Sequence, residues 1–253
     1  MRLKLFACKV LYREISFLSY NSPHILDVTW LRQGFHDTPE LLRKLLQDSI
    51  DAVDEGRDPC SYKNNETQDS QFDAILLGYG LCCNAIVGVV SRRHPLVIPR
   101  GHDCITLLLG SKEEYKRQQD FMRNRGFWYS GGWLENCLMP GKERTDTLRE
   151  RYRQKFGPKK ADFLLDMEQS WINDYDYAAF IDWPELKNAD NIRYAQKCAN
   201  ELGWQMRLIP GSSFLLYDFV NGNWRDEDFL VVPPGQQVAP SYDPSVICLD
   251  RCG

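Results

Sequence analysis

The chain has 253 residues, of which 43% are hydrophobic and 12% aromatic, and it carries a formal net charge of −4. That composition is enough to bury a full core, while the acidic balance argues against a general nucleic-acid binder, which would carry a basic stripe. No apolar run approaches the roughly 20 residues that span a bilayer, and the opening segment, Met1 to Cys8, reads as a strand rather than a secretory signal. We therefore expect a cytoplasmic protein that binds neither nucleic acid nor a membrane.

Cysteine is the most unusual feature of the composition. Nine cysteines are many for a cytoplasmic chain, and their number is odd. A disulfide framework is not expected at this length without a secretory signal. The chain has no pair of C-x-x-C motifs, so any metal site must be assembled from segments that lie far apart in the sequence.

The first half of the chain alternates strand and helix patterns. Apolar runs predict strands, and capped or amphipathic segments predict helices. Such alternation implies a parallel sheet with right-handed crossovers. In a doubly wound lobe, strands numbered in chain order lie side by side across the sheet in the order 2-1-3-4. The predicted strands are 3–8, 25–31, 72–78 and 95–99, and the predicted helices are 10–18, 39–56, 84–90, one from 104, and 111–125.

The second half changes character. Residues 127–137 are rich in aromatic residues and contain adjacent glycines, which favours a lid or substrate-facing loop. Residues 140–173 are highly charged, with a predicted helix break at Gly157-Pro158. A smaller α/β set follows, with strands at 177–181, 204–209 and 229–232 and helices at 190–202 and 214–220.

We expect two Rossmann-like α/β lobes with parallel sheets and a cleft between them, and a single continuous sheet is the alternative. The predicted divisions are an N-terminal lobe at 1–126, an aromatic loop and charged helical linker at 127–175, a smaller C-terminal lobe at 176–235 and a loosely packed tail at 236–253.

Soft-ligand side chains follow the first, third and fourth predicted strands. Cys8 ends the first strand, Cys82 follows the third, and His102 and Cys104 follow the fourth. In open α/β sheets ligands bind beyond the carboxyl ends of the strands, so we expect these side chains to converge. Three thiols and an imidazole match zinc, and thiolates also suit copper(I) or an iron–sulfur cluster. The ordinary alternative is that the cysteines only fill space in the core.

Cys104 is also a candidate nucleophile. Asp103 is placed to cap a helix that begins at Cys104, and a thiol in the first turn of a helix has its pKa lowered by the helix dipole. His102 would then assist the thiolate without any metal. Cys83 is next to Cys82, so its side chain points elsewhere unless the backbone turns sharply. We therefore treat Cys83 only as an alternative metal ligand to Cys82.

Six further residues are assigned to cofactor or substrate binding. Arg100 holds either an anionic substrate or a surface carboxylate, and His36 lies at the same sheet edge, one strand further out. Trp133 and Glu135 either close over the cleft or pack within the aromatic loop. The full set is Tyr79, Asn84, Arg100, His36, Trp133 and Glu135.

The remaining histidines and cysteines are expected to be structural. His24 and His94 are placed in surface loops, and Cys198 lies in the middle of a helix, where it is expected to join the core. Cys248 and Cys252 either form a pair at helical spacing or belong to a floppy tail.

Common nucleotide and hydrolase motifs are absent from the sequence. Gly78-Tyr79-Gly80 is half of a dinucleotide fingerprint, but the rest of G-x-G-x-x-G and the ribose-binding acid are missing, so NAD is not expected. The sequence also lacks a P-loop, a G-x-S-x-G elbow and an H-E-x-x-H motif.

Four segments carry a resemblance to a known family: LLGYGLCCN at 76–84, LVIPRGHDCITLLLGS at 96–111, GWLE at 132–135 and DFLVVPPG at 228–235. Together they resemble the domain-of-unknown-function 1638 family of bacterial and archaeal proteins, over nearly the whole chain. The resemblance implies that Cys8, Cys82, Cys104 and His102 are shared by the family, whereas Cys83 departs from it. It also implies a role in one-carbon or corrinoid-linked metabolism, because members lie beside corrinoid methyltransferase genes in some anaerobes.

These observations lead us to expect a metal-binding protein, most simply a zinc protein, with an iron–sulfur cluster or a corrinoid as alternative cofactors. If the protein is an enzyme, methyl transfer to or from a thiol or corrinoid is the first expectation, with a small molecule or a corrinoid protein as partner. The alternatives are a non-catalytic metal or cofactor carrier or sensor, and a metal-free enzyme that uses Cys104 and His102.

Overall fold

The computed structural model describes residues 1–57, 72–82 and 84–250, so Cys60, Cys83 and Cys252 lie outside the described residues. The chain divides into two compact units. The first combines Met1–Glu114 with Ser212–Gly253, and the second is Tyr115–Gly211. None of the helices in the described residues has the length and apolar content of a membrane span.

The first unit is built on a mixed sheet whose order is β2-β1-β3-β4-β8. The first four of these strands are parallel, so the predicted order 2-1-3-4 and the parallel α/β architecture are confirmed. The fifth pairs antiparallel with β4, and its predicted place in the C-terminal lobe is therefore wrong. The strands are β1 (Arg2–Cys8), β2 (Ile25–Leu31), β3 (Ala74–Gly78), β4 (Leu96–Pro99) and β8 (Phe229–Val232).

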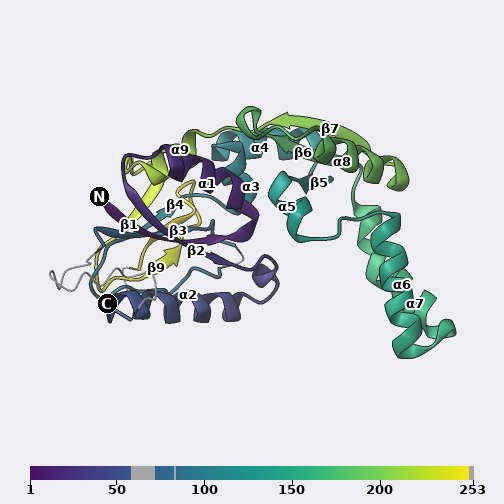
Figure 1. Ribbon diagram of the computed structural model, residues 1–253, viewed down its shortest axis with the longest axis horizontal. Coiled ribbons are helices and arrows are strands. Elements are labelled where there is room, and N and C mark those ends of the chain that lie inside the picture. Colours follow the sequence, from purple (N-terminus) through teal and green to yellow (C-terminus); the bar gives the residue numbers. More distant parts are fainter. Residues whose placement is uncertain (58–71, 83, 251–253) are drawn as a thin grey trace. The chain divides into compact units, whose positions relative to one another are not determined.

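Helices cover both faces of this sheet (Figure 1). The helix α2 lies on one face, and α1, α3 and α9 lie on the other. Leu42, Leu46 and Ile50 recur every four residues along α2, which places them on one side of the helix, and they pack against Phe6 and Leu77 of the sheet. The helical segments are η1 (Lys9–Leu11), α1 (Tyr12–Asn21), η2 (Phe35–Asp37), α2 (Pro39–Asp54), α3 (Cys104–Leu109) and α9 (Phe214–Val220).

Two expectations for the first unit are wrong. The helix predicted at 84–90 is a series of turns, because Asn84 and Gly88 both take left-handed backbone angles, with φ of 65° and 82°. The tail is not loosely packed: β9 (Val238–Pro240) and β10 (Ile247–Leu249) form an antiparallel ribbon whose Val238 and Ile247 join the core on the α2 face.

The second unit holds a separate parallel sheet, ordered β5-β6-β7. Its strands are β5 (Gly126–Tyr129), β6 (Tyr177–Asp182) and β7 (Gln205–Pro210). Its other segments are α5 (Gly131–Asn136), α6 (Lys142–Phe156), α7 (Pro158–Gln169), η3 (Ser170–Asp174), η4 (Pro184–Leu186) and α8 (Ala189–Leu202), and α4 (Lys112–Met122) runs from the first unit into the second.

The segment predicted to be an aromatic lid is part of this second core. Phe127 of β5 stacks at 5.5 Å from Trp171 and meets Trp204 at 5.7 Å, measured between ring centroids. Aromatic richness at 127–137 therefore reflects core packing. The predicted helix break at Gly157 is confirmed, since Gly157 has a φ of 78° between α6 and α7.

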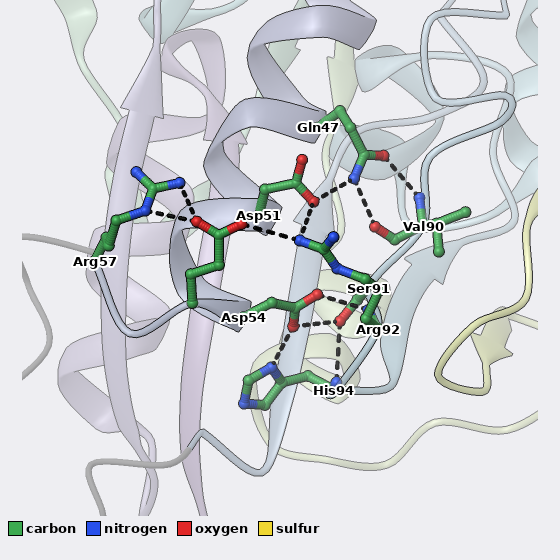
Figure 2. Close-up of polar contacts among 9 residues, drawn as sticks. Gln47, Asp51, Asp54, Arg57, Val90, Ser91, Arg92 and His94 are labelled. Atoms are coloured by element: carbon green, nitrogen blue, oxygen red, sulfur yellow. Dashed lines mark hydrogen bonds and ion pairs between the residues drawn. The ribbon is translucent and has the colours of Figure 1, made fainter.

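A buried polar cluster ties the end of α2 to the segment before β4 (Figure 2). The carboxylate of Asp54 accepts hydrogen bonds from Ser91 Oγ at 2.9 Å, from the Arg92 backbone N–H at 2.6 Å and from His94 Nδ1 at 2.8 Å. His94 is 5% exposed, so its predicted place in a surface loop is wrong. Ser91 donates to Asp54 and not to an imidazole nitrogen, so the three side chains do not form a nucleophilic triad.

Replacing Asp54 with alanine should lower the free energy of unfolding by about 3 kcal/mol, because buried donors lose their acceptor. Burial alone would raise the pKa of Asp54, but the hydrogen bonds from Arg92, His94 and Ser91 together lower it. The carboxylate therefore stabilises the fold above about pH 4, and this contribution is lost as the pH falls through the lowered folded-state pKa. Urea denaturation at neutral and acidic pH measures both effects.

The matched control is Asp48→Ala, on the exposed side of the same helix, where the aspartate is 58% exposed beside Lys44. Its effect should stay below about 0.5 kcal/mol. Equal losses for the two variants would contradict the assignment of Asp54 as the acceptor that joins α2 to β4.

Candidate functional site

Strand alternation places Cys8 and Tyr79 on the same face of the first sheet. Ala7 of β1 is opposite Gly78 of β3, so the next residue of each strand turns to the other face, which is the α2 face. Cys8 and Tyr79 accordingly pack with the core on that face, and Cys82 packs against the same core from the loop after β3. Two of the three predicted thiols and a buried tyrosine therefore share one surface at the carboxyl ends of β1 and β3.

The loops that follow β3 and β4 are fastened to each other by their backbones. Leu81 N–H donates to Gly101 O at 2.8 Å, and Cys82 N–H donates to His102 O at 2.9 Å. A methyl group on Gly80 would lie 2.5 Å from the backbone nitrogen of Asp103, which leaves room only for glycine. This close approach fixes the Cys82 segment against the start of α3, where Cys104 lies.

The position of Cys104 is set by a helix cap. Asp103 Oδ1 accepts hydrogen bonds from the backbone N–H groups of Ile105 at 3.0 Å and Thr106 at 3.1 Å, so the predicted cap is confirmed. Cys104 is then the first residue of α3 and is half-buried, as are Cys8 and Cys82.

The electrostatics at Cys104 are the opposite of those predicted. Burial raises the pKa of the Cys104 thiol well above its ordinary value, and the charges of Asp103, Cys82 and Cys8 raise it further. The prediction that the helix dipole lowers this pKa is wrong, because α3 has only six residues and an anionic cap beside the thiol. A protonated thiol is a poor nucleophile, and the metal-free mechanism that uses Cys104 and His102 stays a prediction.

The same result shows that the three thiols lie within range of one another's charge. Cys8 and Cys82 both act on Cys104, and all three act on Tyr79. The charges of Cys8, Cys82 and Cys104 all reach Tyr79, whereas the meeting of these thiols with His102 at one point stays a prediction.

Tyr79 is the polar group at the centre of this arrangement. It is 3% exposed, and its hydroxyl has no hydrogen-bond partner among the described residues. Burial raises the pKa of Tyr79, and the neighbouring Cys8, Cys82 and Cys104 raise it further, so the phenol stays protonated. A buried hydroxyl without a partner costs about 1–3 kcal/mol.

The side chains do not form a finished coordination sphere. Within 1–57, 72–82 and 84–250, no three His, Cys, Asp or Glu side chains are arranged to hold a metal ion. His102 is exposed at the rim, on the loop after β4. His36 lies in η2, after β2, and its side chain is outside the described atoms.

Arg100 has a structural role. Its Nε donates to Asp226 O at 2.6 Å, its Nη2 lies 2.9 Å from the carboxylate of Asp226, and its Nη1 donates to the backbone oxygens of Ser245 and Ile247. The Asp226 side chain is 96% exposed, so the alternative of a surface carboxylate is the correct one. The guanidinium of Arg100 ties the C-terminal ribbon to β4, and the predicted role in cofactor binding is wrong.

The roles predicted for the other assigned residues stay predictions. Asn84 is exposed, and its backbone oxygen accepts a hydrogen bond from Arg43 at 2.8 Å. Trp133 and Glu135 belong to α5 of the second unit, and Trp133 packs against the core there. Their closure over a cleft between lobes stays a prediction.

The remaining cysteines divide as follows. Cys198 is 3% exposed in the second core, as predicted. Cys248 lies in β10, and its Sγ contacts Pro240 O at 3.6 Å. An extended strand excludes the helical pairing with Cys252, which itself lies outside the described residues.

Sequence reasoning missed two features that shape the site. Cys82 has a left-handed backbone with a φ of 45°, which is rare for a residue other than glycine and costs about 1–3 kcal/mol. Gly80 is needed for close packing, although the Gly-Tyr-Gly pattern suggested only half of a nucleotide fingerprint. Neither property has a local sequence signal, because each depends on where the neighbouring loop lies.

Comparison with known proteins gives a family and no activity. The sequence profile of a family described as "Protein of unknown function (DUF1638)" matches residues 30–220. No curated protein and no solved structure shows significant similarity to the chain. The matched range includes β3, β4 and the loops that carry Cys82, His102 and Cys104. The chain belongs to the DUF1638 family.

Proposed function

We propose that Cys8, Cys82 and Cys104 bind a soft metal ion, most simply zinc, at the carboxyl ends of β1, β3 and β4. The observation that carries the proposal is that Cys8, Cys82 and Cys104 all lie within electrostatic range of the buried Tyr79, whose hydroxyl has no partner among the described residues. Thiolates are the ligands that zinc, copper(I) and iron–sulfur clusters prefer, and the cytoplasm in which we place the chain keeps thiols reduced.

A metal ion supplies what the thiols lack. The half-buried Cys104 thiol resists ionisation, because burial and the negative charges of Asp103, Cys82 and Cys8 raise its pKa. A divalent cation removes this repulsion, and its binding releases the thiol protons. Cysteine side chains rotate about a single torsion, so metal binding at a zinc–sulfur distance of about 2.3 Å would require rotamer changes and loop shifts that bring the three sulfurs together.

The Tyr79 hydroxyl would also have a partner once a metal is bound. A thiolate sulfur or a group on the metal would accept the hydrogen bond that the phenol does not make within the described residues. Hydrogen bonds of this kind to metal ligands orient them and tune their basicity. The cost of burying the hydroxyl is then recovered only when the metal is bound.

Whether His102 binds the metal decides between a catalytic role and a carrier role. Three sulfur ligands leave an open position on zinc, whereas an inward turn of His102 from the rim closes the sphere at four. With the position open, a substrate thiol would bind as a thiolate. Its sulfur would then take a methyl group from a methylated corrinoid, so that the S–C bond forms as the Co–C bond breaks and cobalt keeps that electron pair. With the position closed, the protein would be a metal carrier or sensor.

Anaerobically purified protein should contain about one metal ion per chain by plasma mass spectrometry. Serine at Cys8, Cys82 or Cys104 should each reduce this content at least fivefold, because a hydroxyl does not replace a thiolate ligand for a soft metal. Cys137→Ser is the control, since this exposed cysteine lies in the second unit. Substoichiometric metal in the unaltered chain, or an equal loss in the control, would overturn the proposal.

The variant Tyr79→Phe tests whether the Tyr79 hydroxyl serves metal binding or only the packing of the core. Without metal, the variant should be as stable as the parent or more stable by up to about 1 kcal/mol, because an unsatisfied hydroxyl is removed. Its zinc affinity should fall about tenfold. Thermal unfolding of metal-free and zinc-loaded protein measures both quantities. A destabilised metal-free variant with unchanged zinc affinity would mean that the hydroxyl serves the fold alone.

A further inference from the structure

The hairpin of α6 and α7 is held together by polar contacts. Tyr152 donates a hydrogen bond to the carboxylate of Glu168, Arg144 lies 3.2 Å from that carboxylate, and Gln169 donates to Thr145 at 2.8 Å. Helix α6 contains no buried residue. Its outer surface therefore contributes little to the core of the second unit and is available for another purpose.

The turn of this hairpin carries a concentration of positive charge. The segment 151–161, RYRQKFGPKKA, contains no acidic residue. Elsewhere in the hairpin the cations have acidic neighbours, such as Asp146 beside Lys142 and Arg149. We call the exposed cations of the turn the basic tip, and none of them forms an ion pair with a described residue: Arg151, Arg153, Lys155, Lys159 and Lys160.

This tip stands out against the rest of the molecule. Its five positive charges belong to a chain whose formal net charge is −4. Like charges gathered on one turn repel each other and give no benefit to the fold. Their natural counterpart is a negatively charged surface.

An apolar stripe continues from the basic tip along α7. Ala161 and Leu165 are the buried positions of α7, and residues two places further on lie about 200° around a helix. Phe163 and Met167 therefore face away from the packed side and are 64% and 60% exposed. Phe156, at the turn itself, is 42% exposed with the Lys155 ammonium 5.1 Å from its ring centroid.

We infer that the basic tip, together with Phe163 and Met167, docks an acidic protein partner. Phe163, Met167 and the two arginines of the tip are of the residue types enriched in protein interfaces. Single-stranded DNA and anionic lipid are the other negatively charged surfaces that these cations would meet, and the binding assay distinguishes them from a protein.

The test uses a synthetic peptide in which glutamate alternates with leucine and phenylalanine, and a second peptide with glutamine in place of glutamate. Fluorescence anisotropy with the full chain should show binding of the acidic peptide at least tenfold tighter than that of the glutamine peptide. Combining Arg151→Glu, Arg153→Glu and Lys155→Glu should weaken the acidic peptide at least tenfold. Phe163→Gln with Met167→Gln should also weaken it, at unchanged helicity by circular dichroism.

The control makes the same change in net charge elsewhere, with Lys9→Glu, Arg93→Glu and Lys187→Glu, three exposed cations outside the hairpin. It should bind the acidic peptide as the parent does. Equal binding of the two peptides, or equal loss in the control, would overturn the inference. Tighter binding through the tip to single-stranded DNA, to phosphatidylglycerol vesicles or to a second copy of the chain would overturn it as well.

Discussion

The close approach of two loops governs the chemistry of the first unit. The loop after β3 donates backbone hydrogen bonds from Leu81 and Cys82 to the loop after β4. It comes near enough only because Gly80 has no side chain to meet Asp103. The parallel register of β1 and β3 adds Cys8 to the same rim. The carboxyl edge of the sheet therefore carries Cys8 and Cys82 packed against the core on the α2 face, with Cys104 at the start of α3.

The surroundings of Cys104 and Tyr79 also set the protonation of these two side chains. Burial and neighbouring charges raise the pKa of Cys104 and of Tyr79, so both stay protonated at neutral pH in the absence of a cation. The left-handed backbone at Cys82 adds strain at the same place. The raised pKa of Cys104 is the feature that a nearby positive charge would offset. Arg100 does not meet that need, because its guanidinium is committed to Asp226 and the C-terminal ribbon.

The sequence predicted the sheet of the first unit well because its signals are local. Apolar runs mark β1 to β4, the alternation with helices implies their order, and Asp103 is readable as a cap. Properties that depend on distant partners were not readable. Arg100 meets an acceptor 147 residues away, and His94 meets Asp54 across 40 residues. The apolar run of β8 looks the same whether the strand pairs parallel or antiparallel, so its place beside β4 had no sequence signal.

X-ray absorption at the zinc edge of the zinc-loaded chain tests the central claim most directly. Zinc bound by Cys8, Cys82 and Cys104 should show a shell of sulfur neighbours at about 2.3 Å, and this shell should shrink when Cys104 is replaced by serine. A spectrum that contains only nitrogen and oxygen neighbours at about 2.0–2.1 Å, unchanged in Cys104→Ser, would contradict the assignment of the thiols as a metal centre.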